Sequence, residues 1–374
     1  MPDYKHKYRY PLVDLKKEYE AVGEETLEAI KNVVENGDFI LGDDVSRFEE
    51  EFARFCGVKH CIGVGSGTAA LYIPLLSYGI GSGDEVIVPA FTFIACPRAV
   101  AMTGAIPVPA EVDYETGCID PSLLEKAISK KTKAIMPVHL YGNLAEMDKI
   151  REIADRYQLV VIEDACEALG GSLSGRKTGS LGNTGSFSFY PSKNIGCYGD
   201  GGAITTNDSE LNEKARSIRH YGNGGPAGIN SRLASIQAAV LRKKLPYLED
   251  WNEKRRLNAE IYKKHLQGLP VEFFKTPEDS VPVYYLFVMK TGKRDELINY
   301  LTSKGIEARI HFAPPIHLLE SFAHLGYNKG SFPVAEKLAS EVVSIPMHPF
   351  LSESEISEIS CEIKRFFENQ HSEP

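Results

Sequence analysis

Short apolar runs recur along the first half of the chain, and segments with apolar residues at helical spacing lie between them. The runs are almost continuously hydrophobic, which is typical of parallel strands that are covered on both faces. They are CIGV (61–64), EVIVP (85–89), IPVPAEV (106–112), KAIMPVHL (133–140) and LVVIED (159–164), with TGSFSFY (184–190) and GGAITTN (201–207) further on. The alternation predicts a doubly wound α/β fold with a mostly parallel sheet.

The intervening helical patterns and the C-terminal third suggest two domains. Helices are predicted at 68–79, 121–128, 146–157, 232–245 and 248–266, and another after the capping residue Asp208. Past about residue 270 the grouping changes to a strand at 284–290 and helices at 294–305, 333–342 and 353–368. We therefore predict a large α/β domain over 1–250 and a small C-terminal α+β domain over 251–374. The helix at 15–37 is expected to pack across both.

Composition excludes several classes of protein. The chain has 51 acidic and 42 basic residues, a formal charge of −9, which gives no reason to expect nucleic acid or an anionic membrane as partner. A polar run at 2–9 has no apolar stretch behind it that would act as a signal peptide, so a cytoplasmic location is expected. The seven cysteines are scattered without metal-ligand spacing, so no metal is expected. Cys166 and Cys197 are interpreted as packing residues.

A glycine-rich turn, GVGSGTAALYI (63–73), follows one predicted strand and precedes a predicted helix that Thr68 would open. Unpaired amides and the helix dipole at such a turn favour a phosphate dianion, and glycine lets the backbone approach it closely. A tight connection without a ligand explains this stretch equally well.

Two carboxylates end the strand in LVVIEDACEALGG (159–171). In an open parallel sheet ligands lie beyond the carboxyl ends of the strands, so Glu163 or Asp164 would project towards a site. The alternative is that Asp164 only caps the next segment.

A lysine lies in the Gly-, Ser- and Pro-rich loop within GSFSFYPSKNIGCYGDGGAITTND (185–208), between two predicted strands. Lys193 is therefore held by a turn instead of standing on a helix face. A lysine that forms a Schiff base must be unprotonated part of the time, and burial beside a cationic system would lower its pKa in that direction.

Together these segments resemble the DegT/StrS-type sugar aminotransferases, fold-type-I enzymes that depend on pyridoxal 5'-phosphate and have an aspartate-aminotransferase-like fold. The resemblance runs nearly end to end. It rests on residues 40–71, 83–95, 132–148, 161–171, 187–204, 230–245 and 324–347. In the family pattern, Lys193 takes the place of the Schiff-base lysine, and Asp164 that of the carboxylate on the pyridine nitrogen. Lys193 would also serve as the base for the proton shift.

The resemblance implies further cofactor contacts. Gly67, Thr68 and Ser188 match phosphate-binding positions, and Phe93 matches an aromatic residue that stacks on the ring. Phe93 is also compatible with a core position. Glu167 stands near the ring hydroxyl, where relatives often carry Gln or His. Asn230 matches an asparagine that reaches the phosphate of the neighbouring subunit, which implies a homodimer; the alternative is that it caps the helix at 232–245.

Substrate contacts are less defined by the resemblance. In relatives the region HFAPPIHLLESF (311–322) closes over the sugar, so His317 is a candidate contact, although a structural histidine is the alternative. Tyr221 is a second candidate. Arg219, Arg232 and Arg309 are candidates for binding anionic substrates. The loop at 220–229 is short where some sugar 3-aminotransferases carry a longer insertion, which leaves the substrate open.

The resemblance implies a ping-pong reaction in which L-glutamate converts the cofactor to pyridoxamine 5'-phosphate, and the amine then passes to a nucleotide-linked 3- or 4-keto-sugar. One alternative is a pyridoxamine-phosphate-dependent sugar dehydratase, but that branch replaces the lysine with histidine. A second is a non-enzymatic regulator on the same scaffold. A third is a desulfurase, for which there is no exposed nucleophilic cysteine loop. The nucleotide base and the ketone position stay open.

Overall fold

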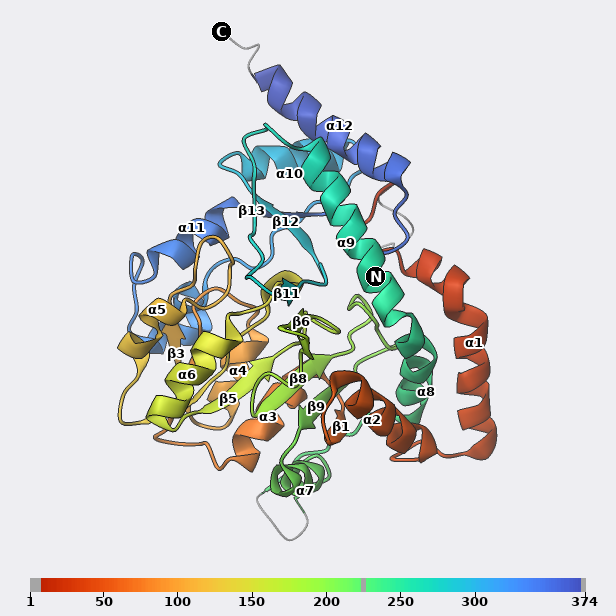
Figure 1. Ribbon diagram of the computed structural model, residues 1–374, viewed down its shortest axis with the longest axis vertical. Helices are drawn as coiled ribbons and strands as arrows, with labels where there is room; N and C mark the ends of the chain where they lie inside the picture. Colours follow the sequence, from red (N-terminus) through yellow and green to blue (C-terminus); the bar gives the residue numbers. More distant parts are fainter. Residues whose placement is uncertain (1–7, 223–226, 371–374) are drawn as a thin grey trace.

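A seven-stranded sheet forms the centre of the computed structural model, which describes residues 8–222 and 227–370. The strands are ordered β1-β9-β8-β5-β4-β2-β3, and the helices cover both faces of the sheet (Figure 1). Their bounds are β1 His60–Val64, β2 Glu85–Pro89, β3 Ile106–Ala110, β4 Thr132–Ile135, β5 Val160–Asp164, β8 Thr184–Ser188 and β9 Gly202–Thr206. The predicted α/β fold with a mostly parallel sheet is confirmed.

The alternation of side chains along the strands explains why both faces are covered. On one face, Ile62 and Val64 of β1 pack with Ile204 of β9 against α3 and α7. On the other, Cys61 and Phe187 pack against α2 and α8. The helices of this part are α1 Leu15–Asn36, α2 Asp43–Cys56, α3 Gly67–Ser77, α4 Ala95–Met102, α5 Pro121–Leu124, α6 Met147–Tyr157, α7 Ser209–Ile218 and α8 Ser235–Lys244, with 3₁₀ turns η1 Glu125–Ala127, η2 Leu140–Gly142 and η3 Leu245–Tyr247.

Strand β9 departs from the parallel pattern and pairs antiparallel with both β1 and β8. The segment between β8 and β9 contains no helix to carry the chain back across the sheet, so β9 runs in the opposite direction. This segment contains Lys193. Because β1, β5 and β8 all point the same way, their carboxyl ends meet at one edge of the sheet.

A second core lies around a three-stranded antiparallel sheet of β10 Glu272–Phe273, β12 Phe287–Lys290 and β13 Val342–Ile345. Helix α9 (Leu248–His265) connects the two cores, since its start packs in the core with α2 and α8 and its end in the second core (Figure 1). The predicted domain boundary at 250/251 falls in its first turn. The other elements here are α10 Arg294–Ser303, η4 Ile316–Leu318, η5 Glu320–Leu325, α11 Pro333–Glu341 and α12 Glu353–Gln370.

The parts before and after α9 are joined by several direct contacts. The backbone N–H groups that begin α11 bind the carboxylate of Glu111, and Ala335 and Leu338 enter the core of the large sheet. Near the N-terminus, Lys17 of α1 forms an ion pair with Glu355 at 2.9 Å, and α1 itself packs along α8. A small sheet of β6 Ser172–Leu173, β7 Arg176–Lys177 and β11 Ser280–Val281 adds a further link.

Local differences from the predicted elements have identifiable causes. Helix α8 begins at Ser235 instead of 232, because Arg232 and Ala234 pair in extended conformation with Val64 and Ile40. Helix α2 was not predicted, although Val45, Phe48 and Phe52 carry a helical spacing. No helix among the described residues is both long and apolar enough to cross a membrane.

Candidate active site

A cavity of about 450 Å³ lies at the carboxyl edge of the large sheet. Its walls come from the turn after β1, the end of β5, the loop between β8 and β9, and two segments from the second half of the chain. The residues that the argument uses are Gly67, Thr68, Thr92, Phe93, Asp164, Cys166, Glu167, Ser188, Lys193, Asp200, Tyr285, His311 and Phe312. This is the position at which open α/β sheets bind ligands.

The glycine-rich turn begins α3 at the floor of this cavity. Ser66 caps the helix through its Oγ, which accepts the N–H of Ala69 at 3.2 Å. A Cβ on Gly67 would stand 2.6 Å from the Cβ of Ser188, so only glycine allows the two segments to meet. The turn therefore presents the amides of a helix start beside the Ser188 and Thr68 hydroxyls, which suits a phosphate group.

Asp164 ends β5 and is held at the sheet edge. Its backbone N–H donates to the backbone oxygen of Pro137 at 2.9 Å, and its Oδ1 accepts the backbone N–H of Cys166 at 3.1 Å. Burial raises the pKa of this carboxyl from 3.8 to about 6, against the opposing effect of the Cys166 N–H. Asp164 thus caps the following turn and also lines the cavity, so the two sequence interpretations are compatible.

Lys193 extends from the loop into the cavity. Its Nζ lies 3.4 Å from Oε1 of Glu167 and 3.9 Å from the centre of the Tyr285 ring. Burial alone would lower the pKa of Lys193, but Tyr285, Glu167, Cys166 and Asp164 outweigh it and raise the pKa above its usual value. The expected lowering of this pKa is therefore wrong for the chain by itself, because the groups that act on the amine are a phenol, a thiol and two carboxylates, and none is a cation.

The loop that contains Lys193 is anchored by hydrogen bonds to helices α8 and α9. Lys244 of α8 donates from Nζ to the backbone oxygen of Gly196 at 2.6 Å and forms a buried ion pair with Glu18 of α1. The side-chain amide of Asn194 donates from Nδ2 to the backbone oxygen of Val283 at 3.1 Å and to Oδ1 of Asn252 in α9 at 2.6 Å. These contacts from two helices fix the loop on which the reactive amine stands.

Behind Asp164, Glu163 is fully buried and serves as a structural acceptor. Its carboxylate accepts His139 Nε2 at 3.0 Å and the N–H groups of Gly179, Leu181 and Gly182 at 2.6, 3.0 and 3.2 Å. Glu163 therefore organises the backbone beside the site and takes no part in the cavity. Of the two carboxylates that the sequence placed at the strand end, Asp164 is the one that faces the site.

We expect Glu163→Ala to lower the free energy of unfolding by about 3 kcal/mol or more, because it leaves buried donors without an acceptor. Denaturant unfolding measures this directly. Glu152→Ala, on the exposed side of α6, is the control and should change stability by about 0.5 kcal/mol or less. A similar small loss for Glu163→Ala would contradict the assigned role.

Three comparisons with known proteins agree with this geometry. The model of the DegT/DnrJ/EryC1/StrS aminotransferase family matches residues 20–364. The chain belongs to this family. A curated relative, the dTDP-3-amino-3,4,6-trideoxy-alpha-D-glucose transaminase of Streptomyces venezuelae, is 45% identical over 92% of each chain.

Solved structures of the family superpose closely on this chain. The X-ray structure of S. venezuelae DesV in complex with a ketimine intermediate has a TM-score of 0.94 at 43% identity, covering 96% of this chain and 99% of the other. The structure of NtdA from Bacillus subtilis with bound cofactor PMP has a TM-score of 0.86 at 30% identity, covering 97% and 89%. The predicted resemblance and the aminotransferase class are confirmed.

The cavity of this DegT/DnrJ/EryC1/StrS family member fits pyridoxal 5'-phosphate, the family's cofactor. A lysine amine, a buried carboxylate and a helix-start phosphate cradle line the same cavity. The hydroxyl Oγ1 of Thr92 is buried there without a hydrogen-bond partner in the described part of the chain. Phe93 is half-exposed at the cavity wall, with its ring 5.2 Å from that of Phe312, so the core interpretation of Phe93 is wrong.

Two substrate candidates have structural roles instead, which corrects their assignment. Arg219 is buried and binds Glu49 at 2.5 Å and the backbone oxygen of Gly63 at 2.8 Å. His317 is buried, with Nε2 2.9 Å from Oε1 of Glu336. Neither lines the cavity, and each is occupied by a partner that the sequence pattern did not reveal.

Asn230 and Tyr221 lie outside the cavity of their own chain and are exposed. The capping alternative for Asn230 is wrong, because α8 begins at Ser235 after Ala234. Arg232 binds His220 Nδ1 at 2.9 Å, and Arg309 pairs with Glu307 at 2.5 Å. In the loop 220–229, residues 223–226 lie outside the described residues.

The structure also adds residues that the sequence interpretation missed. His311 lines the cavity, whereas His317 in the same predicted segment does not. Tyr285 covers Lys193 and approaches the hydroxyl of Ser192 at 3.2 Å. The sequence interpretation chose His317 from the Pro-rich segment 311–322, because the choice between its two histidines depends on backbone path, which no local pattern encodes.

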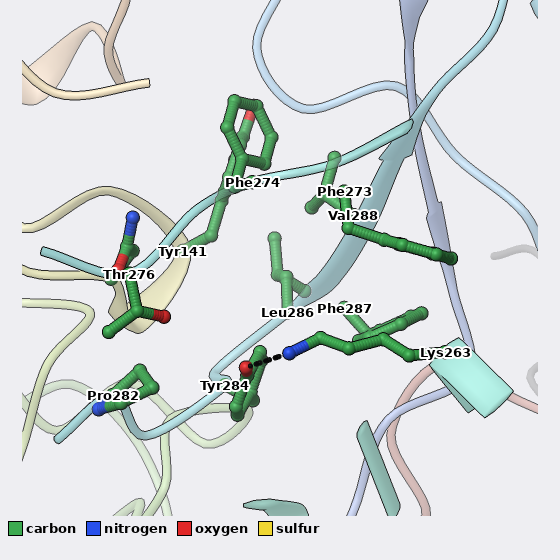
Figure 2. Close-up of a pocket in the computed structure, with 11 residues that line it drawn as sticks. Tyr141, Lys263, Phe273, Phe274, Thr276, Pro282, Tyr284, Leu286, Phe287 and Val288 are labelled. Carbon is green, nitrogen blue, oxygen red and sulfur yellow. Dashed lines mark hydrogen bonds between the residues drawn. The ribbon is translucent and has the colours of Figure 1, made fainter. Parts of the chain in front are cut away.

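A second, smaller pocket near β12 does not compete with this site. Figure 2 shows Lys263 directed at the Tyr284 hydroxyl, at 2.9 Å, among Phe273, Phe274 and Phe287. Its volume of about 30 Å³ has room for little more than a water molecule. This pocket is therefore a packing feature of the small sheet.

Proposed function

We propose that this chain transfers an amino group from L-glutamate to the keto carbon of a nucleotide-linked sugar, with pyridoxal 5'-phosphate bound in the cavity. The observation that supports it most strongly is that the Lys193 amine, the Asp164 carboxylate and the Gly67 turn line one cavity. The S. venezuelae relative is named for a transamination of a dTDP-linked sugar, which supports the substrate class. A cytoplasmic location stays a prediction.

The bound cofactor supplies an aldehyde that condenses with amines and a ring that withdraws electrons. The residues of the chain supply the rest. Asp164 would stabilise positive charge on the ring nitrogen, and the Gly67 turn with Ser188 would hold the phosphate. Lys193 Nζ would hold the cofactor and would accept and return the proton at the carbon that bears the amine. Tyr285 and Phe312 narrow the cavity and limit the access of water.

The charges in the cavity support a dimeric site. Among the described residues that line it, Asp164, Glu167 and Asp200 are carboxylates, and Lys193 is the one Lys or Arg. Glutamate and a sugar diphosphate are anions, so they need cations from outside this wall. Arg232 belongs to the segment 230–235, outside the cavity of its own chain, and we infer that a second copy brings this segment to the site.

An apolar surface lies next to that segment. Phe39 and Ile40 are about half-exposed, and their backbone pairs with Ser235 and Ala234. Leu27 and Val34 are exposed on neighbouring α1, two helical turns apart, and so share a face. Figure 1 shows α1 on the outer side of α8. Exposed apolar side chains gathered in this way favour an interface between subunits.

We expect the chain to be a homodimer and the double variant Phe39→Glu/Ile40→Glu to shift it towards monomer, because charges in an apolar interface lose their hydration. Sedimentation velocity at several protein concentrations measures the change. Leu257→Glu replaces an equally exposed apolar residue on α9 and should leave the dimer intact. A monomeric wild-type protein would contradict the shared site.

The experiment that tests the proposed function supplies the holoenzyme with L-glutamate and with 3-keto and 4-keto sugars linked to dTDP, UDP or GDP. Mass spectrometry detects the amino-sugar, and 2-oxoglutarate is measured in the same samples. We expect both products in equal amounts from at least one acceptor. Loss of the sugar hydroxyl without gain of nitrogen would favour the dehydratase alternative, and no conversion of any acceptor would contradict the proposed substrate class.

A further inference from the structure

Glu167 faces the reactive amine at close range. Its Oε1 lies 3.4 Å from Lys193 Nζ, and its Oε2 accepts the backbone N–H of Tyr141 at 2.8 Å. The side chain is buried, with 6% of its surface exposed. The two oxygens of this carboxylate therefore have different partners, one a fixed amide and the other the amine.

Tyr141 holds the carboxylate in this orientation. It has a φ of 60°, in the left-handed region that non-glycine residues rarely adopt, and it is buried. Its hydroxyl donates to the backbone oxygen of His311, which lines the cavity. The amide that binds Oε2 is thus fixed by contacts on both sides, and Oε1 is directed at Lys193.

The amine needs a proton acceptor before it can react. The titratable groups that face it are Asp164, Cys166 and Glu167 from the end of β5, Tyr285 from the segment before β12, and His311. Together the first four raise the pKa of Lys193, against the effect of burial, so the amine holds its proton at neutral pH. Asp164 Oδ1 already accepts the Cys166 N–H, whereas Oε1 of Glu167 is in ion-pair contact with Nζ.

We propose that Glu167 is the proton partner of Lys193: its Oε1 takes a proton from Nζ when the amine becomes a nucleophile and returns it when the amine is released. In the forward step one proton moves from Nζ to Oε1, and the nitrogen bonds to the carbonyl carbon. The carbonyl oxygen then leaves as water with the two remaining amine protons. The inference rests on the proposed function, because it assigns Lys193 the condensing amine.

The two roles open to Glu167 predict opposite effects when the carboxylate is removed. A carboxylate that only pairs with the amine stabilises the protonated amine, so replacing it with an amide frees the amine and speeds condensation. A carboxylate that takes the proton from Nζ speeds condensation itself, so replacing it slows this step by about 100-fold or more. The two cases differ in direction and can be separated without any turnover.

The test mixes the cofactor-free full-length chain with saturating pyridoxal 5'-phosphate at neutral pH and follows by stopped flow the visible band of the cofactor joined to Lys193. In Glu167→Gln, we expect the rate constant of this band to fall about 100-fold or more below that of the wild type. In Glu167→Asp, which keeps a carboxylate, the rate constant should recover to within about tenfold of the wild type.

Asp200→Asn removes a charge from the same cavity without touching the amine, and it should behave like the wild type. A rate constant in Glu167→Gln that equals or exceeds that of the wild type would overturn the inference. Circular dichroism of Glu167→Gln checks that it folds, and Glu167→Asp provides the second comparison. The measurement uses neither L-glutamate nor keto-sugar, so failure of the proposed function would appear separately, as a holoenzyme that converts no keto-sugar.

Discussion

Lys193→Ala should lower kcat for amino transfer by about four orders of magnitude or more. The substitution removes both the amine that binds the cofactor and the base that moves the proton, and each contribution alone is large. The structure offers no substitute, since Lys193 is the one Lys or Arg among the described residues that line the cavity. Formation of 2-oxoglutarate from L-glutamate in the presence of a keto-sugar measures the loss.

A control separates this effect from general damage. Lys254→Ala removes an exposed lysine of α9 that pairs with Asp250 on the surface, and its kcat should match that of the wild type. Circular dichroism and thermal unfolding of Lys193→Ala should show a folded protein, because the loop is anchored by Lys244 and Asn194 and not by Lys193. A folded Lys193→Ala variant with substantial turnover would contradict the assignment.

Asp164→Asn has the second largest expected effect, a fall in kcat of about two to three orders of magnitude. The amide keeps the shape and can still accept the Cys166 N–H, but it cannot stabilise a positive charge on the cofactor ring. The matched control is Asp200→Asn in the same cavity, for which a much smaller change is expected. Equal effects of the two substitutions would mean that only the net charge of the cavity matters.

The raised pKa of Asp164 predicts that the free energy of unfolding of the cofactor-free chain depends on pH. Burial raises the pKa of its carboxyl from 3.8 to about 6, so the folded state favours the protonated form. The stabilising contribution of the protonated Asp164 carboxyl to the free energy of unfolding is complete below pH 3.8. It is lost as the pH rises through about 6. The stability of Asp164→Asn relative to the wild type should therefore increase between pH 4 and pH 7, as denaturant unfolding at the two pH values would show. No change in this difference would contradict the buried position.

The sequence was sufficient for the features that follow from local patterns and one topological rule. Asp164 and the Gly67 turn follow hydrophobic runs, and parallel strands bring such ends to one edge. Lys193 lies in a loop whose composition excludes a helix, and the same property explains why β9 runs antiparallel. The resemblance to the family then connected the three segments to one cofactor.

Features that depend on contacts between residues far apart along the chain could not be predicted from a single sequence. Arg219 was a plausible substrate cation until the structure placed Glu49 of α2 beside it. The pKa of Lys193 was expected to be lowered, but contacts with Tyr285 and Glu167, which lie in other segments of the chain, raise it. The choice of His311 over His317 likewise depends on how the second half of the chain packs on the first.

The absorption spectrum of the purified protein with pyridoxal 5'-phosphate, before and after L-glutamate, tests the central claim most directly. In the wild type we expect a visible band from the cofactor joined to Lys193, and its conversion by glutamate to the pyridoxamine 5'-phosphate spectrum. Lys193→Ala should lack the band, while Lys254→Ala should retain it. A wild-type spectrum without a band that depends on Lys193, or a band that glutamate leaves unchanged, would contradict the claim that this cavity is the active site of an aminotransferase.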